Sequence, residues 1–242
     1  MLNQIAATNI LCLDIETVPQ HPSLDQVPDE LRAMWLRKAS NLKNEEALSE
    51  ELFYRRAGIY AEFGKIICIS TGFLHVKDGT RQFRLRSFYG DDEATLLREF
   101  SSLLAQIHSS RKGQPMILCG HNAKEFDFPY ICRRMVINGI LLPPQLDNAG
   151  KKPWDVPLLD TMELWKFGDY KSFTPLNLLA HILGIPSPKD DIDGSQVGQV
   201  YWEEKNLQRI VTYCQKDVAT VMQIVLKMKG EMILEREEIE VI

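Results

Sequence analysis

Two strand-sized segments joined by a tight turn constrain the fold of this chain more than any other feature of its sequence. Residues 64–74 and 81–88 are each predicted to form a strand, and Lys77-Asp78-Gly79-Thr80 between them is typical of a hairpin turn, because Asp-Gly readily supplies the positive φ angles that such turns need. Downstream, helical and strand patterns alternate, which is typical of a sheet flanked by helices. These patterns predict an α/β fold with a central sheet of mixed direction.

The other elements are predicted from apolar periodicity and from residues that begin or end helices. A first strand, Asn9 to Leu13, is followed by a helical segment from about residue 20 to residue 61, interpreted as an insertion after that strand. Further helices are expected at 91–107, 128–137, 176–183 and 203 to about 235, with a strand at 116–119, a loop at 148–154 and a frayed, charged C-terminal end. No repeat or linker divides the sequence, so residues 1–242 are expected to form a single domain.

Composition and charge restrict the class of protein. The chain has 242 residues, of which 45% are hydrophobic, enough for a sizeable core. Its net charge is -5, so no global basic field attracts nucleic acid or an anionic membrane, and a polyanionic substrate must be held locally or through bound cations. The five cysteines lack zinc-site spacing and the apolar runs are strand-sized. A reduced, cytoplasmic protein without a membrane partner is therefore expected.

Carboxylates occur at three places where local structure should turn them inward. Asp14 and Glu16 are two residues apart at the end of the first predicted strand, so their side chains should share a face. Asp127 lies between a short strand and a helix, and Tyr213 and Asp217 are four residues apart on one face of the last helix. Each acid also has a structural interpretation: a turn cap, a helix N-cap or a salt bridge to an inward arginine.

Taken together, these four acids favour a metal site. Oxygen ligands in this number, without histidine or cysteine, suit Mg²⁺ or Mn²⁺ rather than zinc. Such a cluster could hold two ions about 4 Å apart, one activating a water and one stabilising the leaving oxygen of a phosphodiester. The hydroxyl of Tyr213 could orient the attacking water.

The order of these residues resembles the three motifs of the DEDD superfamily of 3'-5' exonucleases, which have an RNase H-like fold. Asp14-Ile15-Glu16 matches D-x-E, residues 122–127 match N-x-x-x-F-D, and residues 213–217 match Y-x-x-x-D. Thr212 stands where the histidine subclass has its histidine, so the chain resembles the tyrosine (DEDDy) subclass. The resemblance extends from Asn9 to about Lys229, and the local sequence is most similar to the stand-alone bacterial group related to the exonuclease domain of family B DNA polymerases.

The resemblance implies a role for each catalytic residue. Asp14 would bridge two divalent ions, Glu16 and Asp217 would complete one metal site, and Asp127 would hold the other ion, mostly through water. Tyr213 would position the nucleophile. The implied cofactors are therefore two Mg²⁺ or Mn²⁺ ions.

The resemblance also implies a substrate-binding set and a reaction. The backbone of Thr17 and Val18 would bind the terminal nucleotide, and Asn122 and Phe126 would line the strand, although core packing explains Phe126 equally well. The expected reaction removes nucleoside 5'-monophosphates from 3' ends of single-stranded DNA, in replication proofreading or repair with partners that the sequence leaves open. The alternatives are an RNase D-type exoribonuclease and a non-catalytic nucleic-acid-binding module.

Overall fold

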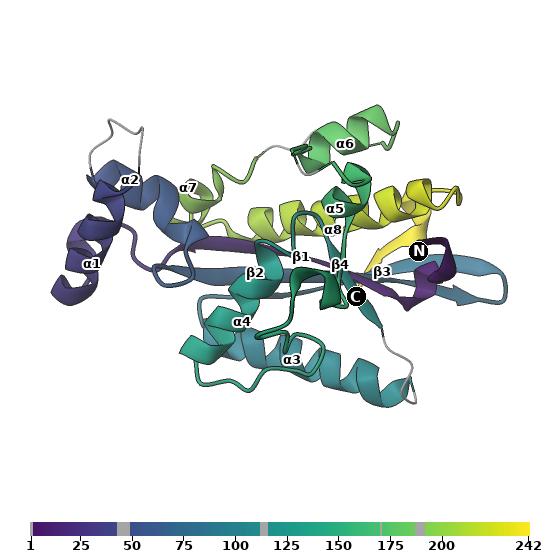
Figure 1. The fold of residues 1–242 in the computed structure, drawn as a ribbon, viewed down its shortest axis with the longest axis horizontal. Coiled ribbons are helices and arrows are strands. Elements are labelled where there is room, and N and C mark those ends of the chain that lie inside the picture. The colour runs from purple at the N-terminus through teal and green to yellow at the C-terminus, as the bar shows by residue number, and fades with distance from the viewer. Residues whose placement is uncertain (1, 43–48, 112–115, 170, 187–191) are drawn as a thin grey trace.

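A sheet of six strands in the order β5-β4-β1-β2-β3-β6 forms the centre of the fold (Figure 1). The computed structural model describes residues 2–42, 49–111, 116–169, 171–186 and 192–242. The strands are β1 (Ile10–Pro19), β2 (Gly64–Lys77), β3 (Thr80–Tyr89), β4 (Ile117–Gly120), β5 (Leu159–Asp160) and β6 (Ile239–Val241). β1, β2 and β3 pair antiparallel, whereas β4, β5 and β6 add in parallel. The predicted α/β fold with a mixed sheet is confirmed.

The hairpin that limited the possible folds forms as predicted. Asp78 and Gly79 both have positive φ, 51° and 79°, and Lys77 pairs with Thr80 at the end of the β2–β3 ladder. A two-residue turn of this kind matches the twist of the strands that it joins. The ladder continues to the pair Cys68 and Tyr89, so the turn also sets the register of β2 near the centre of the sheet.

Helices cover both faces of the sheet (Figure 1). On one face lie α3 (Glu93–Ser110) and α4 (Asp127–Ile137), and on the other lie α5 (Thr161–Lys166), α6 (Leu176–Ile182) and the long α8 (Leu207–Met228). Side chains of β1 alternate between the two cores: Leu11 and Leu13 join the α3–α4 core, whereas Ile10 and Cys12 join the α8 core. Asp14 follows Ile10 and Cys12 in this alternation, so its side chain points toward α8.

The helical insertion forms its own small core at one end of the sheet. It contains α1 (Asp29–Ser40) and α2 (Ser49–Arg56), which pack around a fully buried Trp35. The Trp35 ring lies edge-on to Phe53 at 5.4 Å and to Phe63 at 5.2 Å between ring centroids. Beside the insertion lies the short α7 (Val197–Trp202) (Figure 1), and the hydroxyl of Tyr54 donates to Glu203 at 2.6 Å, tying α2 to the segment after α7.

Several sequence-based boundaries were wrong. The last helix covers Leu207–Met228 rather than 203–235, because Gly230 turns the chain with a φ of 69°. The C-terminal end is not frayed: β6 adds to the edge of β3, and Arg81 holds Glu238 at 2.8–2.9 Å. The predicted loop at 148–154 ends in a 3-10 turn at Pro153–Asp155, and β5, α5 and α7 were not predicted. Among the described residues, no helix has the length and hydrophobicity needed to cross a bilayer.

Candidate active site

β1 carries two of the predicted acids past the middle of the sheet. Asp14 pairs with Ser70 and Glu16 with Cys68 on β2, and the register shifts after Glu16. The sequence placed both acids at the end of a strand, which was wrong, because β1 continues to Pro19. Glu16 is only 7% exposed. The strand therefore places two carboxylates side by side on its α8 side, one of them almost without solvent.

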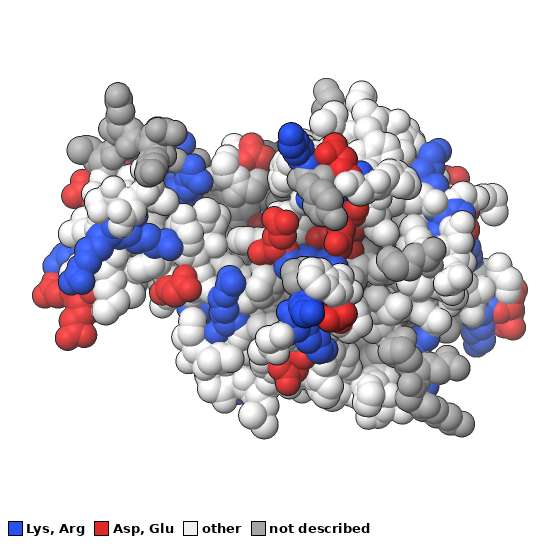
Figure 2. All heavy atoms as spheres, in the orientation of Figure 1, with Lys and Arg blue, Asp and Glu red and all other residues white. Residues whose placement is uncertain are grey.

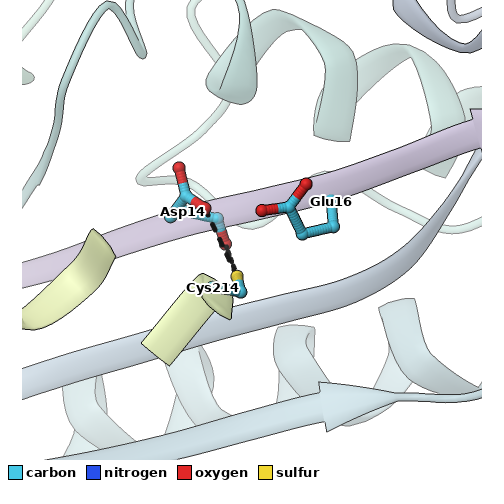
Figure 3. Close-up of side chains that lie close together, drawn as sticks. All are labelled: Asp14, Glu16 and Cys214. Atoms are coloured by element: carbon cyan, nitrogen blue, oxygen red, sulfur yellow. Dashed lines mark hydrogen bonds between the residues drawn. The ribbon is translucent and has the colours of Figure 1, made fainter. Parts of the chain in front are cut away.

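α8 presents a thiol to this pair of acids. The Sγ of Cys214 donates to Oδ2 of Asp14 at 3.3 Å and to its backbone oxygen at 3.4 Å, while the carboxylate of Glu16 turns toward Asp14 (Figure 3). One ligand atom from each of Asp14, Glu16 and Cys214 lies within 4.8 Å of the others. Sequence reasoning missed Cys214; the signal was its place next to Tyr213 on the inward face of a helix.

Asp127 reaches the same strand from the other side of the sheet. It is the first residue of α4, and its Oδ1 accepts a hydrogen bond of 3.1 Å from the backbone N–H of Ile15. Phe126 occupies the N-cap position, so the alternative interpretation of Asp127 as the N-cap residue was wrong. Its carboxylate is instead fixed to the peptide between Asp14 and Glu16.

The loop before α4 depends on an acid that the sequence analysis did not select. Asp160, at the end of β5, accepts backbone hydrogen bonds from Asn122 at 2.9 Å, from Lys124 at 3.0 Å and from Met162 at 2.9 Å. Asn122 has a φ of 59°, and its buried side-chain oxygen has no hydrogen-bond partner in the structure. An Asp directly before a helix start was the available signal, because Asp is a favoured N-cap. Asp160 thereby fixes the turn that leads into Asp127.

The other predicted binding residues lie nearby, but differ in what they offer a ligand. Val18 is fully buried and packs with Val197 and Ile210, so only its backbone could contact a substrate; Thr17 is half-buried. Phe126 is half-buried, joins the α3–α4 core and lies 5.3 Å from the ring of Tyr130. Core packing therefore accounts for much of the Phe126 side chain.

Mutual repulsion and burial dominate the electrostatics of this site. Burial, followed by the charges of Asp127, Glu16 and Asp217, raises the pKa of Asp14 well above its usual value. Burial and Asp217 do the same to the pKa of Glu16, and burial raises the pKa of Asp127 to about 7 although the Ile15 N–H opposes the shift. Asp217 thus raises the pKa of acids from two separate segments, β1 and α4.

Tyr213 lies in the same electrostatic environment. Burial and then the charges of Asp217, Glu16 and Asp14 raise the pKa of its hydroxyl far above the usual value, and a hydrogen bond with Asp217 contributes in the same direction. The hydroxyl is therefore protonated at neutral pH. α8 thus supplies a neutral hydrogen-bonding group and an acid from the same helix face, next to the acids of β1.

The chemistry of these donors fits a divalent metal. Carboxylates that are buried together are stable in their charged form only when a cation or hydrogen bonds compensate them. The described cluster is rich in hard oxygen donors, which suit Mg²⁺ or Mn²⁺, with one softer thiol at its edge. Acidic side chains also gather near the middle of the molecular face shown, in the region between α4 and α5 (Figure 2).

Comparison with known proteins identifies the family. Residues 59–240 match a sequence family described as a predicted 3'-5' exonuclease related to the exonuclease domain of PolB. The chain belongs to this PolB-type exonuclease family. The matched range contains Asp127, Tyr213 and Asp217 but begins after Asp14 and Glu16, which the fold places beside them. Among curated proteins, no sequence matches the chain.

A solved structure supports the same fold over more of the chain. The family B DNA polymerase from the hyperthermophilic archaeon Pyrobaculum calidifontis is similar over 90% of this chain, with a TM-score of 0.52 and 17% sequence identity. The chain spans 24% of that polymerase, about a quarter of its length. The likeness is one of fold, and it confirms the predicted RNase H-like architecture with a mixed sheet flanked by helices.

Proposed function

We propose that this protein is a divalent-metal-dependent 3'-5' exonuclease that removes nucleoside 5'-monophosphates from the 3' end of single-stranded DNA. One observation carries the proposal: acids from β1, α4 and α8 meet on one strand, and each raises the pKa of another. Membership in a family of predicted 3'-5' exonucleases supports the reaction class. The fold likeness to a DNA polymerase is consistent with DNA as the substrate.

In this proposal, Asp14, Glu16, Asp127 and Asp217 hold two Mg²⁺ or Mn²⁺ ions. Ions bound there would lower the pKa of the attacking water and stabilise the charge that develops on the phosphodiester. The chain itself contributes fixed positions for the acids. The Ile15 N–H holds the carboxylate of Asp127 and the Cys214 thiol holds that of Asp14, so both acids are oriented before substrate arrives.

Tyr213 orients the nucleophile rather than deprotonating it. Because its pKa is raised, the hydroxyl keeps its proton at working pH and can donate one hydrogen bond while accepting another. A group of this kind fixes the direction from which water attacks. The backbone at Thr17 and Val18 directly follows Glu16 on β1, which suits it to contact the terminal nucleotide.

The decisive experiment is degradation of matched 5'-labelled single-stranded DNA and RNA with Mg²⁺, with Mn²⁺ or with EDTA. We expect a ladder that begins at the 3' end of DNA, needs metal and releases 5'-monophosphates. Asp217→Ala should lower the rate by roughly 10³-fold, because it removes several kcal/mol of transition-state stabilisation. Asp147→Ala, which changes an exposed acid after α4, is the matched control and should retain the wild-type rate.

Each other result has a definite meaning. A stronger ladder on RNA would replace the DNA substrate by RNA and place the protein with RNase D-type enzymes. Binding of both strands without any ladder would favour a non-catalytic module. A wild-type rate in Asp217→Ala would contradict the metal assignment.

A further inference from the structure

A cavity lies beside α7 and the start of α8. It has a volume of about 360 Å³ and is lined by Lys65, Asp91, Tyr201, Trp202, Lys205 and Leu207. We name it the lysine pocket. Its volume falls within the range of ligand pockets, roughly 300–1,000 Å³. No acid of the candidate active site lines it.

Lys65 is held in this pocket with hydrogen-bonding capacity to spare. Its Nζ donates to the hydroxyl of Tyr201 at 2.8 Å, and that hydroxyl donates to Oδ1 of Asp91 at 2.5 Å. An ammonium has three donors, so two remain for a ligand. The lysine is half-buried, and burial lowers its pKa. The Lys65 ammonium is thus partly dehydrated and has two N–H donors with which it can bind an anion.

Trp202 and Lys205 complete the pocket. The Trp202 ring lies 5.2 Å from Nζ of Lys65 and 5.0 Å from Nζ of Lys205, measured to the ring centroid. Its indole N–H donates to the backbone oxygen of Pro19 at 3.2 Å, which fixes the ring against the end of β1. Within the described part of the chain, neither ammonium forms an ion pair with a carboxylate within 4.0 Å.

The lysine pocket is connected to the active site through β1 and one apolar cluster. Lys65 pairs with Val18 on β1, two residues beyond Glu16. Val18 packs in a cluster to which both Trp202 and Tyr213 are joined. At about 3.3 Å per residue, the three residues from Glu16 to Pro19 span roughly 10 Å. This equals about three nucleotides of a stacked strand, at ~3.4 Å of rise each.

We propose that the lysine pocket binds a phosphodiester group of the same nucleic-acid strand whose 3' end lies at the acids, about three nucleotides from that end. The inference rests on the proposed function. Lys65 and Lys205 supply two positive charges, Asp91 is already engaged by Tyr201, and the Trp202 ring supplies a rigid apolar wall. The pocket therefore supplies local positive charge, in addition to bound metal, with which a chain of net charge -5 can hold a polyanion.

Binding of a labelled strand tests this inference independently of hydrolysis. Fluorescence anisotropy of a long 5'-labelled oligothymidylate is measured with Ca²⁺, which binds the same class of oxygen ligands as Mg²⁺. We expect Lys205→Gln and Lys65→Gln each to raise Kd about fivefold. Each should also reduce the slope of log Kd against log salt by about 0.7, the value for one lost phosphate contact on a single strand.

A matched control lies on the same strand as Lys65. Lys77 is an exposed lysine at the other end of β2, twelve residues or roughly 40 Å away, so Lys77→Gln makes the same charge change outside the pocket. Its Kd and salt slope should equal those of wild type. Circular dichroism and thermal unfolding of all variants verify that the fold is retained, and Lys205→Gln, which changes an exposed side chain, is the variant least coupled to folding.

Substrate length separates this inference from the proposed function. A thymidine dinucleotide is too short to reach the pocket, so the lysine variants should hydrolyse it with wild-type kcat and KM while their KM for the long strand rises. Unchanged Kd in the Lys65→Gln, Lys205→Gln double variant would overturn the inference, whether or not the protein hydrolyses DNA. A second result would also overturn the inference: inorganic phosphate inhibits the wild-type protein, and the lysine variants lose this inhibition while their Kd for the strand stays unchanged. The pocket would then hold free phosphate and not the strand.

Discussion

Two glutamates of equal burial on opposite faces of the sheet have opposite environments. Glu16 and Glu93 are each 7% exposed. Glu93 accepts hydrogen bonds from Arg134 at 2.6 and 2.8 Å and from the Ile66 backbone at 2.7 Å. Glu16 faces Asp217 and Asp127, which raise its pKa, and it has no such cationic partner among the described residues. Burial alone therefore does not separate a structural acid from a functional one.

The two glutamates differ in whether the chain itself compensates the buried carboxylate charge. Arg134 also donates to the backbone oxygen of Ala61 at 2.7 Å, so the buried ion pair joins α3, α4 and the end of the insertion. A buried charge is tolerated because its partner and hydrogen bonds are supplied within the chain. At Glu16 the chain supplies further acids instead, which leaves the compensation to a bound cation.

The largest expected effect is on activity at the uncompensated acid. Glu16→Gln should lower exonuclease turnover by roughly 10³-fold, because it removes a metal ligand. The same change should raise the thermal stability of the metal-free protein, since it removes a repulsive charge. Single-turnover kinetics and calorimetry measure the two effects, with exposed Glu237→Gln as the control. If Glu16→Gln lost stability and kept its activity, Glu16 would be a structural acid like Glu93.

The matching change at the compensated acid should affect stability instead. Glu93→Gln leaves Arg134 buried without its partner charge and should lower the free energy of unfolding by about 3–5 kcal/mol. Urea denaturation measures the loss. Adding Arg134→Met should recover part of it, because both charges are then absent. The folded fraction of Glu93→Gln should retain its activity per molecule, and a specific loss of catalysis would make Glu93 part of the site.

Asp160 lies between these extremes, because backbone N–H groups rather than a cation compensate it. Asp160→Asn replaces one acceptor oxygen by a donor group and should loosen the turn that leads to Asp127. We expect the metal concentration for half-maximal activity to rise about tenfold, the lower range for residues that support metal ligands. A fall in kcat at saturating metal, with no change in the metal dependence, would contradict this positioning role.

The smallest effect concerns pH in the metal-free protein. Folding raises the pKa of Asp127 to about 7 from a reference of 3.8, so between these values the folded chain binds more protons than the unfolded chain. The free energy of unfolding should therefore fall as pH rises from about 4 to 7. The melting temperature in EDTA should decrease by several degrees over this range, and Asp127→Asn should flatten the slope. An increase with pH would show that Asp127 is charged in the folded metal-free state.

Local patterns were enough to predict most of the architecture. The Asp-Gly turn, the apolar runs and the helical stripes each depend on neighbours in sequence, and the hairpin, α3, α4 and α6 formed close to their expected positions. The predictions failed where pairing is remote. β5 has two residues and β6 has three, and each exists because a distant strand, β4 or β3, offers an open edge. Cys214 and Asp160 were missed because their partners lie far away in sequence.

By itself, the sequence determined the class of fold, the candidate acids and the chemistry that their oxygen ligands suit, because strand and helix periods, turn residues and motif spacing are local properties. Only the tertiary structure decided that Asp127 is fixed to the Ile15 amide, that Cys214 contacts Asp14, and that Lys65 and Lys205 share a pocket. The physical reason is that desolvation and charge interaction depend on distance in space. They are set only when the sheet brings β1, α4 and α8 together.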